Sequence, residues 1–402
     1  MNYQVKCFVC GKEVADPYAD HCPHCEGGLS VEMDLSAAAE IGLAGMRKRP
    51  LGVWRYAELL PVPAAAKVSL QEGGTPLYDC EAMRSLVNCG KFLVKFEGAN
   101  PTGSFKDRGM TVGVSRAKQL GCKVVGCAST GNTSASLAAY AAKAGMGSVV
   151  LLPSGTVAMG KLAQAMFYGA KVITVDGSFD DALRVVRQLA AEGELYLLNS
   201  VNPFRPEGQK TLGFEVIDQF GVPDVIVFPV GNAANIWASY KGFLEYRQLG
   251  WINHVPRFVG VQAEGSAPLV KAFAAGTKDF VAEDHPETIA TAIRIGNPAS
   301  GRKALEAMRT SGGTCLSVTD EEILGAQKLL GRREGIGVEP ASAASVAGII
   351  KMRQLNLLDR DEIVVCVCTG HVLKDPDTVI KNAPPLISCK ADAASVRKAI
   401  NS

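Results

Sequence analysis

The stretch KVVGCASTGNTSAS, residues 123–136, joins an apolar run to a turn and then to a helical pattern. Runs rich in Val and Ile favour β-strands, and Gly131 permits a tight turn after this one. DVIVFPV (224–230) leads in the same way into Gly231-Asn-Ala-Ala-Asn235 and an apolar-periodic helix. Strands separated by helix-length segments indicate parallel sheets with crossover helices, and hence an α/β fold.

Further apolar runs continue this alternation, and no short repeat, low-complexity tract or long linker interrupts it. We therefore expect one body from about residue 50 to 385, with room for two open, twisted, mostly parallel α/β lobes. The further runs are FLVKF (92–96), SVVLLP (148–153), KVITV (171–175), LYLLN (195–199), FVGVQ (258–262) and IVVCVC (363–368).

The composition is typical of a soluble globular protein. Of the 402 residues, 47% are apolar and 20% are charged, which excludes disordered and fibrous classes. Lys and Arg number 42 against 40 for Asp and Glu, so no net field favours nucleic acid or a membrane surface. The sequence shows no basic-then-apolar leader and no run of about 18 apolar residues. We therefore expect a cytoplasmic protein.

Four of the twelve cysteines form two CxxC pairs near the N-terminus, separated by eleven turn-rich residues. Two such turns can give four thiolates to one tetrahedral ion and leave no open position for catalysis, so the pattern predicts a small zinc ribbon with structural Zn²⁺. His21 and His24 are alternative ligands that neighbouring cysteines make superfluous. The other eight cysteines are expected to be reduced core residues. The expected ligands are Cys7, Cys10, Cys22 and Cys25.

The charge of this ribbon argues against a role in binding nucleic acid. Residues 1–34 contain two lysines against six acidic side chains. Such a balance repels phosphate backbones, so no nucleic-acid partner is expected.

The segment NPTGSFKDRG, residues 100–109, follows a strand and opens a helix. Ser104 is the expected N-cap and Asp107 its capping-box partner, which places Lys106 in the first helical turn. Unpaired amides and the helix dipole disfavour a proton on an amine at that position. Because a neutral amine can form a Schiff base, Lys106 is a candidate covalent anchor.

Three other segments offer groups to an anionic ligand. Asn132 can present an amide after its turn, and the backbone N–H groups of residues 231–235 can cradle a phosphate. The strand IVVCVC ends at Thr369, which puts a hydroxyl at the carboxyl edge of a sheet, where ligands of open α/β sheets usually bind.

These motifs together resemble those of threonine synthases, which are pyridoxal-phosphate enzymes of fold type II. That group includes tryptophan synthase β chains, serine and threonine dehydratases and cysteine synthases. The resemblance runs from about Gly52 to Asp377. Besides the Lys106 segment it rests on EGGTPL (72–77), ASTGNTSAS (128–136), LNSVNPFRPEGQKT (198–211), GNAAN (231–235), AIRIGNP (292–298), VEPASAAS (338–345) and TGHVLKDP (369–376).

The resemblance also implies how the chain is divided. We expect a zinc ribbon and linker over residues 1–45, a catalytic body over residues 46–385 and a tail over residues 386–402. The smaller lobe of the body is expected at about residues 101–214, with the larger lobe formed by the flanking segments. A homodimer is usual among such enzymes.

Cofactor contacts follow from the same resemblance. Lys106 is expected to hold pyridoxal 5′-phosphate, Asn132 to meet its 3′-oxygen, and Thr369 to face the ring nitrogen and leave it largely unprotonated. The family commonly has glycine where Ala234 stands, and the added methyl group hinders only a backbone with positive φ. The cofactor phosphate is assigned to Gly231, Asn232, Ala233, Ala234 and Asn235.

The implied reaction converts O-phospho-L-homoserine and water to L-threonine and phosphate by γ-elimination and β-addition. Arg205 has the clearest physical rationale, because a planar guanidinium can clamp a phosphate with paired hydrogen bonds. The substrate carboxylate is assigned to Ser129, Thr130 and Thr133, and the substrate phosphate to Asn199, Ser200, Arg205 and Asn232.

Three alternatives stay open. A cysteate synthase would use O-phospho-L-serine and sulfite, and a threonine dehydratase would need no phosphate clamp. Arg205 argues against the dehydratase only. A zinc-ribbon binding or scaffold protein with an inert enzyme body is disfavoured, because no residue expected to be catalytic is replaced.

Overall fold

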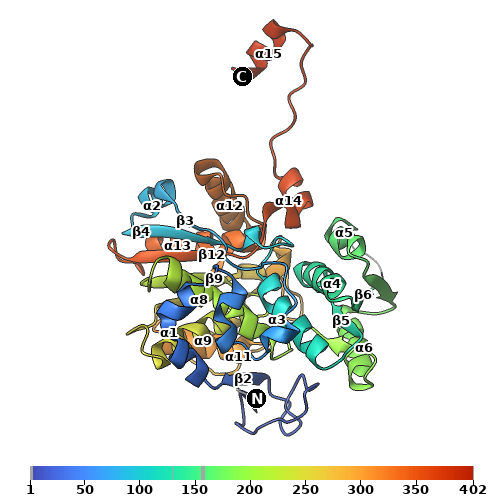
Figure 1. Cartoon of the computed structure of the whole chain (residues 1–402). Coiled ribbons are helices and arrows are strands. Elements are labelled where there is room, and N and C mark those ends of the chain that lie inside the picture. Colours follow the sequence, from blue (N-terminus) through green and yellow to red (C-terminus); the bar gives the residue numbers. More distant parts are fainter. Residues whose placement is uncertain (1–2, 130, 155–158, 402) are drawn as a thin grey trace.

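The computed structural model describes residues 3–129, 131–154 and 159–401. Two mostly parallel sheets with helices on their faces form the body, and a two-stranded antiparallel ribbon lies beneath it in Figure 1. The predicted α/β class is therefore confirmed. The ribbon strands are β1 (Tyr3–Cys7) and β2 (Leu29–Met33), and α1 (Ser36–Arg47) follows them.

The smaller sheet has four parallel strands in the order β7-β6-β5-β8. Its strands are β5 (Val124–Ala128), β6 (Gly147–Pro153), β7 (Lys171–Val175) and β8 (Tyr196–Leu197), connected by α4 (Asn132–Ala144), α5 (Met159–Phe167) and α6 (Phe179–Ala191). We call these elements the four-stranded lobe.

The larger sheet has the order β11-β10-β9-β12-β4-β3, and only the edge strand β3 runs antiparallel to its neighbour. Its strands are β3 (Leu77–Asp79), β4 (Lys91–Phe96), β9 (Val225–Pro229), β10 (Arg257–Ala263), β11 (Thr314–Val318) and β12 (Ile363–Cys368). With it go α2 (Glu81–Val87), α8 (Thr211–Gln219), α9 (Ala234–Gln248), α10 (Pro268–Ala274), α11 (Gly301–Thr310), α12 (Asp320–Glu334) and α13 (Pro340–Gln354). We call these elements the six-stranded lobe.

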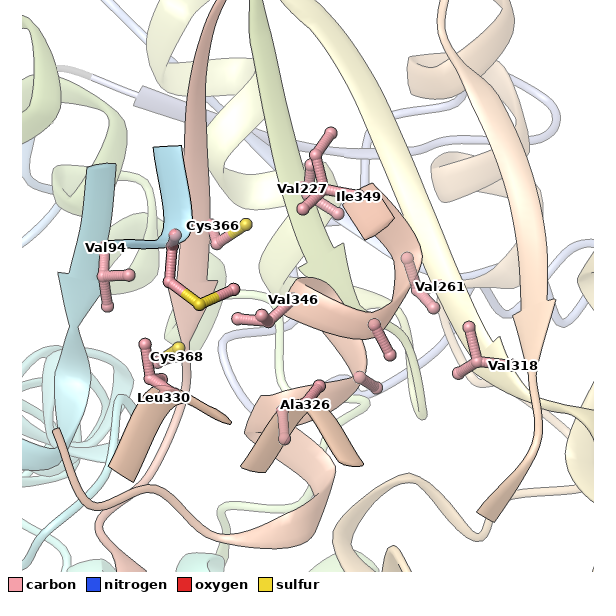
Figure 2. Packing of buried hydrophobic residues seen from close by; sticks show 14 of the residues in the cluster. Val94, Val227, Val261, Val318, Ala326, Leu330, Val346, Ile349, Cys366 and Cys368 are labelled. Carbon is pink, nitrogen blue, oxygen red and sulfur yellow. The ribbon is translucent and has the colours of Figure 1, made fainter. Parts of the chain in front are cut away.

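One buried cluster shows how helices cover the larger sheet (Figure 2). Val346 and Ile349 of α13 belong to it together with Val227 of β9 and Ala326 of α12. A Cβ at Gly348 would lie 2.3 Å from a methyl of Val261, so glycine lets α13 approach the sheet closely. Each large aliphatic side chain buried here contributes about 1.5–3 kcal/mol, which holds the strand ends in fixed register.

That register decides where the site forms. Strands β9 and β12 are parallel neighbours, with Val225 opposite Val364. The loops that follow them, residues 231–235 and Thr369, therefore leave the sheet at the same edge.

The remaining helices are α3 (Lys106–Gln119), α7 (Arg205–Gln209), α14 (Pro376–Lys381) and α15 (Ala393–Ile400). Figure 1 shows α15 at the end of an extended segment that leaves the body. Among the described residues, no helix has both the length and the apolar character needed to cross a membrane.

Candidate active site

Lys106 lies in the first turn of α3, as predicted, and is the first residue of that helix, but the cap before it differs from the expected one. Phe105 stands at the N-cap, and no side chain caps the helix. The predicted capping box of Ser104 and Asp107 is wrong. The Asp107 carboxylate instead accepts hydrogen bonds from the N–H and hydroxyl of Thr102, at 2.7 and 2.6 Å. Asp107 therefore closes the preceding turn rather than the helix end.

The start of α3 is tied to the end of β12. The Phe105 N–H donates to the Thr369 carbonyl at 3.0 Å, and Ser104 forms an isolated bridge with Gly370. The amine of Lys106 and the hydroxyl of Thr369 are thereby held at one edge of the larger sheet. The Thr369 hydroxyl lies 3.0 Å from that of Ser342 on α13.

The surroundings of the Lys106 amine favour its neutral form. Burial lowers its pKa to about 7, the positive charge of Arg205 contributes in the same direction, and Glu339 opposes them. The amine also lies 4.0 Å from the centre of the Phe105 ring, a contact that favours the protonated form and opposes the effect of burial. A substantial neutral fraction near pH 7 is what a Schiff-base lysine requires.

Arg205 reaches this site because α7 packs closely on α3. A Cβ at Gly208 would lie 1.8 Å from the Arg108 carbonyl, and one at Gly109 would lie 3.1 Å from the Arg205 carbonyl. Arg205 is only 2% exposed, and burial lowers its pKa to about 10. One guanidinium nitrogen donates to the Leu198 carbonyl at 3.1 Å, while the buried Nε has no partner among the described residues. A buried guanidinium with an unused donor is suited to an anion.

A buried ion network behind α3 was not predicted. The Arg108 guanidinium lies 2.6 Å from the Glu97 carboxylate and 2.7 Å from that of Glu215, and Lys95 lies 2.8 Å from Glu215. Burial alone would raise the pKa of Glu215, but Arg108 and Lys95 lower it to about 2. The network fixes α3 two residues beyond Lys106. Its only sequence signal is a lysine inside the apolar run FLVKF.

Asn132 is the first residue of α4, and its side chain meets a carboxylate. Its Nδ2 lies 3.1 Å from both oxygens of Glu339, which stands at the N-cap of α13. The sequence motif VEPASAAS contains Glu339, but no feature of that motif identified it as a site residue.

The loop 231–235 connects β9 to α9 and can hold a phosphate. Ala233 occupies the N-cap with φ 66°, while Ala234 is the first helical residue. The left-handed position therefore falls one residue before the alanine expected to matter. A Cβ at Gly231 would lie 3.0 Å from the Cα of Ile293. Asn235 is buried, and neither end of its amide has a partner among the described residues. This unpaired amide at a helix start fits an anionic group.

The residues assigned to the substrate have varied surroundings. Both ends of the Asn199 amide pair with the backbone of Ala128, each at 3.0 Å. The Asn232 side chain accepts from the Ala299 N–H at 3.4 Å, and Ser129 accepts from the Gly131 N–H at 3.3 Å. A direct phosphate contact by Asn199 would therefore require these backbone bonds to be exchanged. Thr133 is buried in the first turn of α4 and Ser200 is partly exposed after Asn199, while Thr130 lies outside the described residues.

The four N-terminal cysteines come together as a separate group. Their sulfur atoms all lie within 4.8 Å of one another. The Cys7 and Cys25 sulfurs are 3.5 Å apart, and those of Cys10 and Cys22 are 3.7 Å apart. A tetrahedral zinc with Zn–S bonds of about 2.3 Å needs edges of about 3.8 Å, so the donor set fits this ion.

An α/β body with a buried lysine of lowered pKa at the start of one helix and an unpaired amide at the start of another is typical of a class of cofactor-dependent enzyme. The chain belongs to the family described as pyridoxal-phosphate dependent enzymes, whose model matches residues 68–370. It is similar to the threonine synthase of Methanosarcina acetivorans, with 55% identity over 99% of this chain and 98% of that protein. The threonine synthase of Methanocaldococcus jannaschii is also 55% identical, over 96% of each chain.

Solved structures show the same fold at low sequence identity. Maize serine racemase matches with a TM-score of 0.67 and 21% identity, over 76% of this chain and 90% of that one. Threonine deaminase isoform 2 from Solanum lycopersicum matches with a TM-score of 0.68 and 20% identity, over 84% of this chain and 96% of that one. These likenesses concern the fold alone.

Proposed function

We propose that this chain is a threonine synthase, a lyase that converts O-phospho-L-homoserine and water to L-threonine and phosphate. The observation that carries the proposal is 55% identity to a threonine synthase over 99% of the chain. The surroundings of Lys106 supply the chemistry that this reaction needs.

Pyridoxal phosphate, when bound, supplies an electron sink for the α-carbon of the substrate. Lys106 is proposed to anchor it and to move protons between the α, β and γ carbons of the substrate, because its amine exchanges a proton near pH 7. Asn132 and Thr369 are proposed to contact its 3′-oxygen and ring nitrogen. Its phosphate is proposed to lie at Gly231, Asn232, Ala233, Ala234 and Asn235.

Arg205 is proposed to orient the phosphate that leaves from the γ-carbon. Its burial and its unused Nε donor support this role. Charge grows on the leaving oxygens as the C–O bond breaks, and a donor already in place stabilises that charge without reorganisation. Asn199, Ser200 and Asn232 are proposed to assist, and Ser129, Thr130 and Thr133 to bind the substrate carboxylate.

The four cysteines are proposed to bind one structural Zn²⁺. Their sulfur separations support this, as do the backbone N–H groups of Val9 and Cys10, which point at the Cys7 sulfur at 3.3 and 3.4 Å. The four thiolates complete a tetrahedral site without a histidine, and His21 pairs with Asp20. The ribbon and linker (1–45), body (46–385) and tail (386–402) are the proposed units, in a cytoplasmic homodimer.

Product analysis tests the function. Purified protein with pyridoxal phosphate should release threonine and phosphate in equal amounts from O-phosphohomoserine. Turnover of O-phosphoserine only with sulfite would instead indicate a cysteate synthase, and deamination of threonine a dehydratase. If the protein binds no cofactor and turns over none of these substrates, the result would favour a binding or scaffold protein with an inert enzyme body over an enzyme.

A further inference from the structure

Glu339 lies inside the candidate site, and none of the roles above uses it. It is only 4% exposed and stands at the N-cap of α13 with extended backbone. Its N–H donates to the Gly370 carbonyl at 3.1 Å. The main chain therefore fixes Glu339 beside the end of β12, next to Thr369.

The carboxylate of Glu339 reaches across to the four-stranded lobe. Both of its oxygens lie 3.1 Å from Nδ2 of Asn132 on α4. Helices α4 and α13 belong to different lobes, so this pair links the lobes within the site. A Cβ at Gly370 would lie 2.5 Å from Oε1. Glycine at that position leaves the space that the carboxylate occupies.

This contact determines how the Asn132 amide is oriented. An ionised carboxylate only accepts hydrogen bonds, whereas an asparagine amide has a donating end and an accepting end. Glu339 therefore selects the orientation in which Nδ2 faces it. The same nitrogen carries a second N–H, which remains for another acceptor. An acceptor such as the 3′-oxygen of the cofactor matches that donor.

The ionisation of Glu339 and the orientation of the Asn132 amide depend on each other. Burial raises the pKa of Glu339, while the hydrogen bond from Asn132, followed by Lys374 and Lys106, lowers it, and Asp375 raises it. Removing the Asn132 amide would therefore raise the pKa of Glu339 further. Removing Glu339 would leave the amide free to rotate.

We propose that Glu339 is a positioning residue that orients the Asn132 amide toward the 3′-oxygen of the cofactor. Through its backbone bond to Gly370, it also couples this contact to the strand end that carries Thr369. The assignment rests on the proposed function, since it requires pyridoxal phosphate at Lys106. The positioning effect of Glu339 runs through Asn132, beside the direct effect of its charge on Lys106.

A double-mutant cycle on the purified, cofactor-loaded enzyme tests this assignment. The measured quantity is the pH midpoint of the visible absorbance of the bound cofactor. Asn132→Ala removes the donor and should shift the midpoint by roughly one pH unit, the size of one hydrogen bond to a charged group. Glu339→Ala should shift it in the same direction by less. The double variant should match Asn132→Ala after subtraction of the direct effect of the Glu339 charge on Lys106, which is the shift that Glu339→Gln produces.

Two further variants separate positioning from general effects of folding and charge. Glu339→Gln keeps the shape and one accepting oxygen, so it should retain most of the wild-type midpoint. Glu321→Gln removes the same charge on the exposed side of α12 and should leave the midpoint unchanged. If Glu339→Ala does not fold, the cycle is run with Glu339→Asp, which keeps the charge near Lys106 but withdraws the carboxylate from Asn132, so its shift must vanish in the Asn132→Ala background.

Additive shifts, or a wild-type midpoint in Glu339→Ala beside a shifted Asn132→Ala, would overturn the role of Glu339 and leave the proposed function intact. A wild-type protein without any visible cofactor band would overturn both.

Discussion

Burial and the charge of Arg205 lower the pKa of the Lys106 amine to about 7, and this value predicts how the cofactor-free enzyme captures pyridoxal phosphate. The neutral amine is the nucleophile, so the capture rate should rise with pH through a midpoint near 7. The measurement is stopped-flow absorbance of cofactor binding from pH 6 to 9. A free lysine analogue, with a pKa of about 10.4, is the control. A midpoint near 10 for the protein would contradict the buried environment.

The same pKa predicts a stability effect with a definite sign. Between pH 7 and 10 the unfolded chain holds a proton on Lys106 that the folded chain has lost, so folding stability contributed by this group rises with pH. Lys106→Met in the cofactor-free protein removes the buried charge. Its stability relative to wild type should be greatest below pH 7 and should fall as pH rises toward 10. Urea unfolding at several pH values measures the difference. A constant difference would show that Lys106 titrates normally.

Arg205 is predicted to act on the substrate phosphate and not on the cofactor. Arg205→Ala should reduce kcat/KM for O-phosphohomoserine roughly 30- to 150-fold, through loss of a charge-assisted contact. This factor corresponds to a loss of about 2–3 kcal/mol in transition-state stabilisation. Arg205→Lys keeps the charge but not the planar pair of donors, so its loss should be smaller yet substantial. Steady-state kinetics measures both.

A matched control for these variants is Arg184→Ala, which removes an exposed arginine of α6 that pairs with Asp181. It should retain wild-type kinetics. Wild-type kcat/KM in Arg205→Ala would show that the substrate phosphate is held elsewhere.

Residues whose roles depend on local chain order were predicted better than residues whose partners are distant. The position of Lys106 at the start of α3 was correct, because a strand, a turn and a helix follow one another there. Asp107 was misassigned, since its partner Thr102 closes a turn that the capping pattern did not reveal. Glu339 could not be identified, because Asn132 lies 207 residues away along the chain.

At the scale of elements, the close packing of α3 and α7 predicts a costly substitution. Gly208→Ala would place a methyl 1.8 Å from the Arg108 carbonyl, so the two helices must move apart. Overpacking of this kind costs about 1–3 kcal/mol, and it should also reduce activity by displacing Arg205 relative to Lys106. Urea unfolding and steady-state kinetics measure the two effects.

The control is Gly325→Ala on α12, where the added Cβ meets nothing within 4 Å. Alanine there should stabilise the protein by about 0.5–1 kcal/mol and leave activity unchanged. If Gly208→Ala were as well tolerated as Gly325→Ala, close helix packing would not be what places Arg205.

The apolar runs of the sequence predicted every strand of the two sheets of the body, including β7 and β8 at the edges of the smaller sheet, except β3 and β11 at the edges of the larger sheet. All eight predicted runs overlap strands β4 to β10 and β12. Strand β3 has two exposed residues of three, and β11 has two buried and three partly buried residues. Strands that are only partly buried can carry polar side chains, so they need not form an apolar run. The strand order β11-β10-β9-β12-β4-β3 depends on contacts between distant segments and was likewise not predicted.

At the scale of the molecule, the N-terminal ribbon contacts both lobes. Lys303 of α11 donates to the Leu29 carbonyl at 2.6 Å, and the Phe8 ring packs edge-on against Trp237. On the other side, Asp20 pairs with Arg187 of α6 at 3.1 Å. Figure 1 shows the ribbon at the bottom of the view, below the six-stranded lobe. The ribbon therefore braces the two lobes from the side opposite α14.

Because the ribbon contacts both lobes, loss of its metal is expected to destabilise the folded protein. Cys7→Ser/Cys22→Ser should lose the single zinc per chain that we propose, because two of the four thiolates are gone. Without the metal the ribbon is too small to stay folded, so its contacts with both lobes should be lost. A loss of about 2 kcal/mol would lower the Tm by roughly 2–3 °C in a chain of 402 residues. Metal analysis and calorimetry measure the two effects.

The control for this variant is Cys389→Ser, because Cys389 is an exposed free thiol in the C-terminal segment. It should keep both zinc and Tm. Lys303→Met provides a second comparison, since it leaves all four cysteines in place but removes the contact with Leu29. It should retain zinc, lower the Tm by less than the double cysteine variant, and increase proteolysis between the ribbon and α1. If the cysteine variant loses zinc but keeps the wild-type Tm and protease resistance, the ribbon does not brace the lobes. If it keeps full zinc content, the metal lies elsewhere.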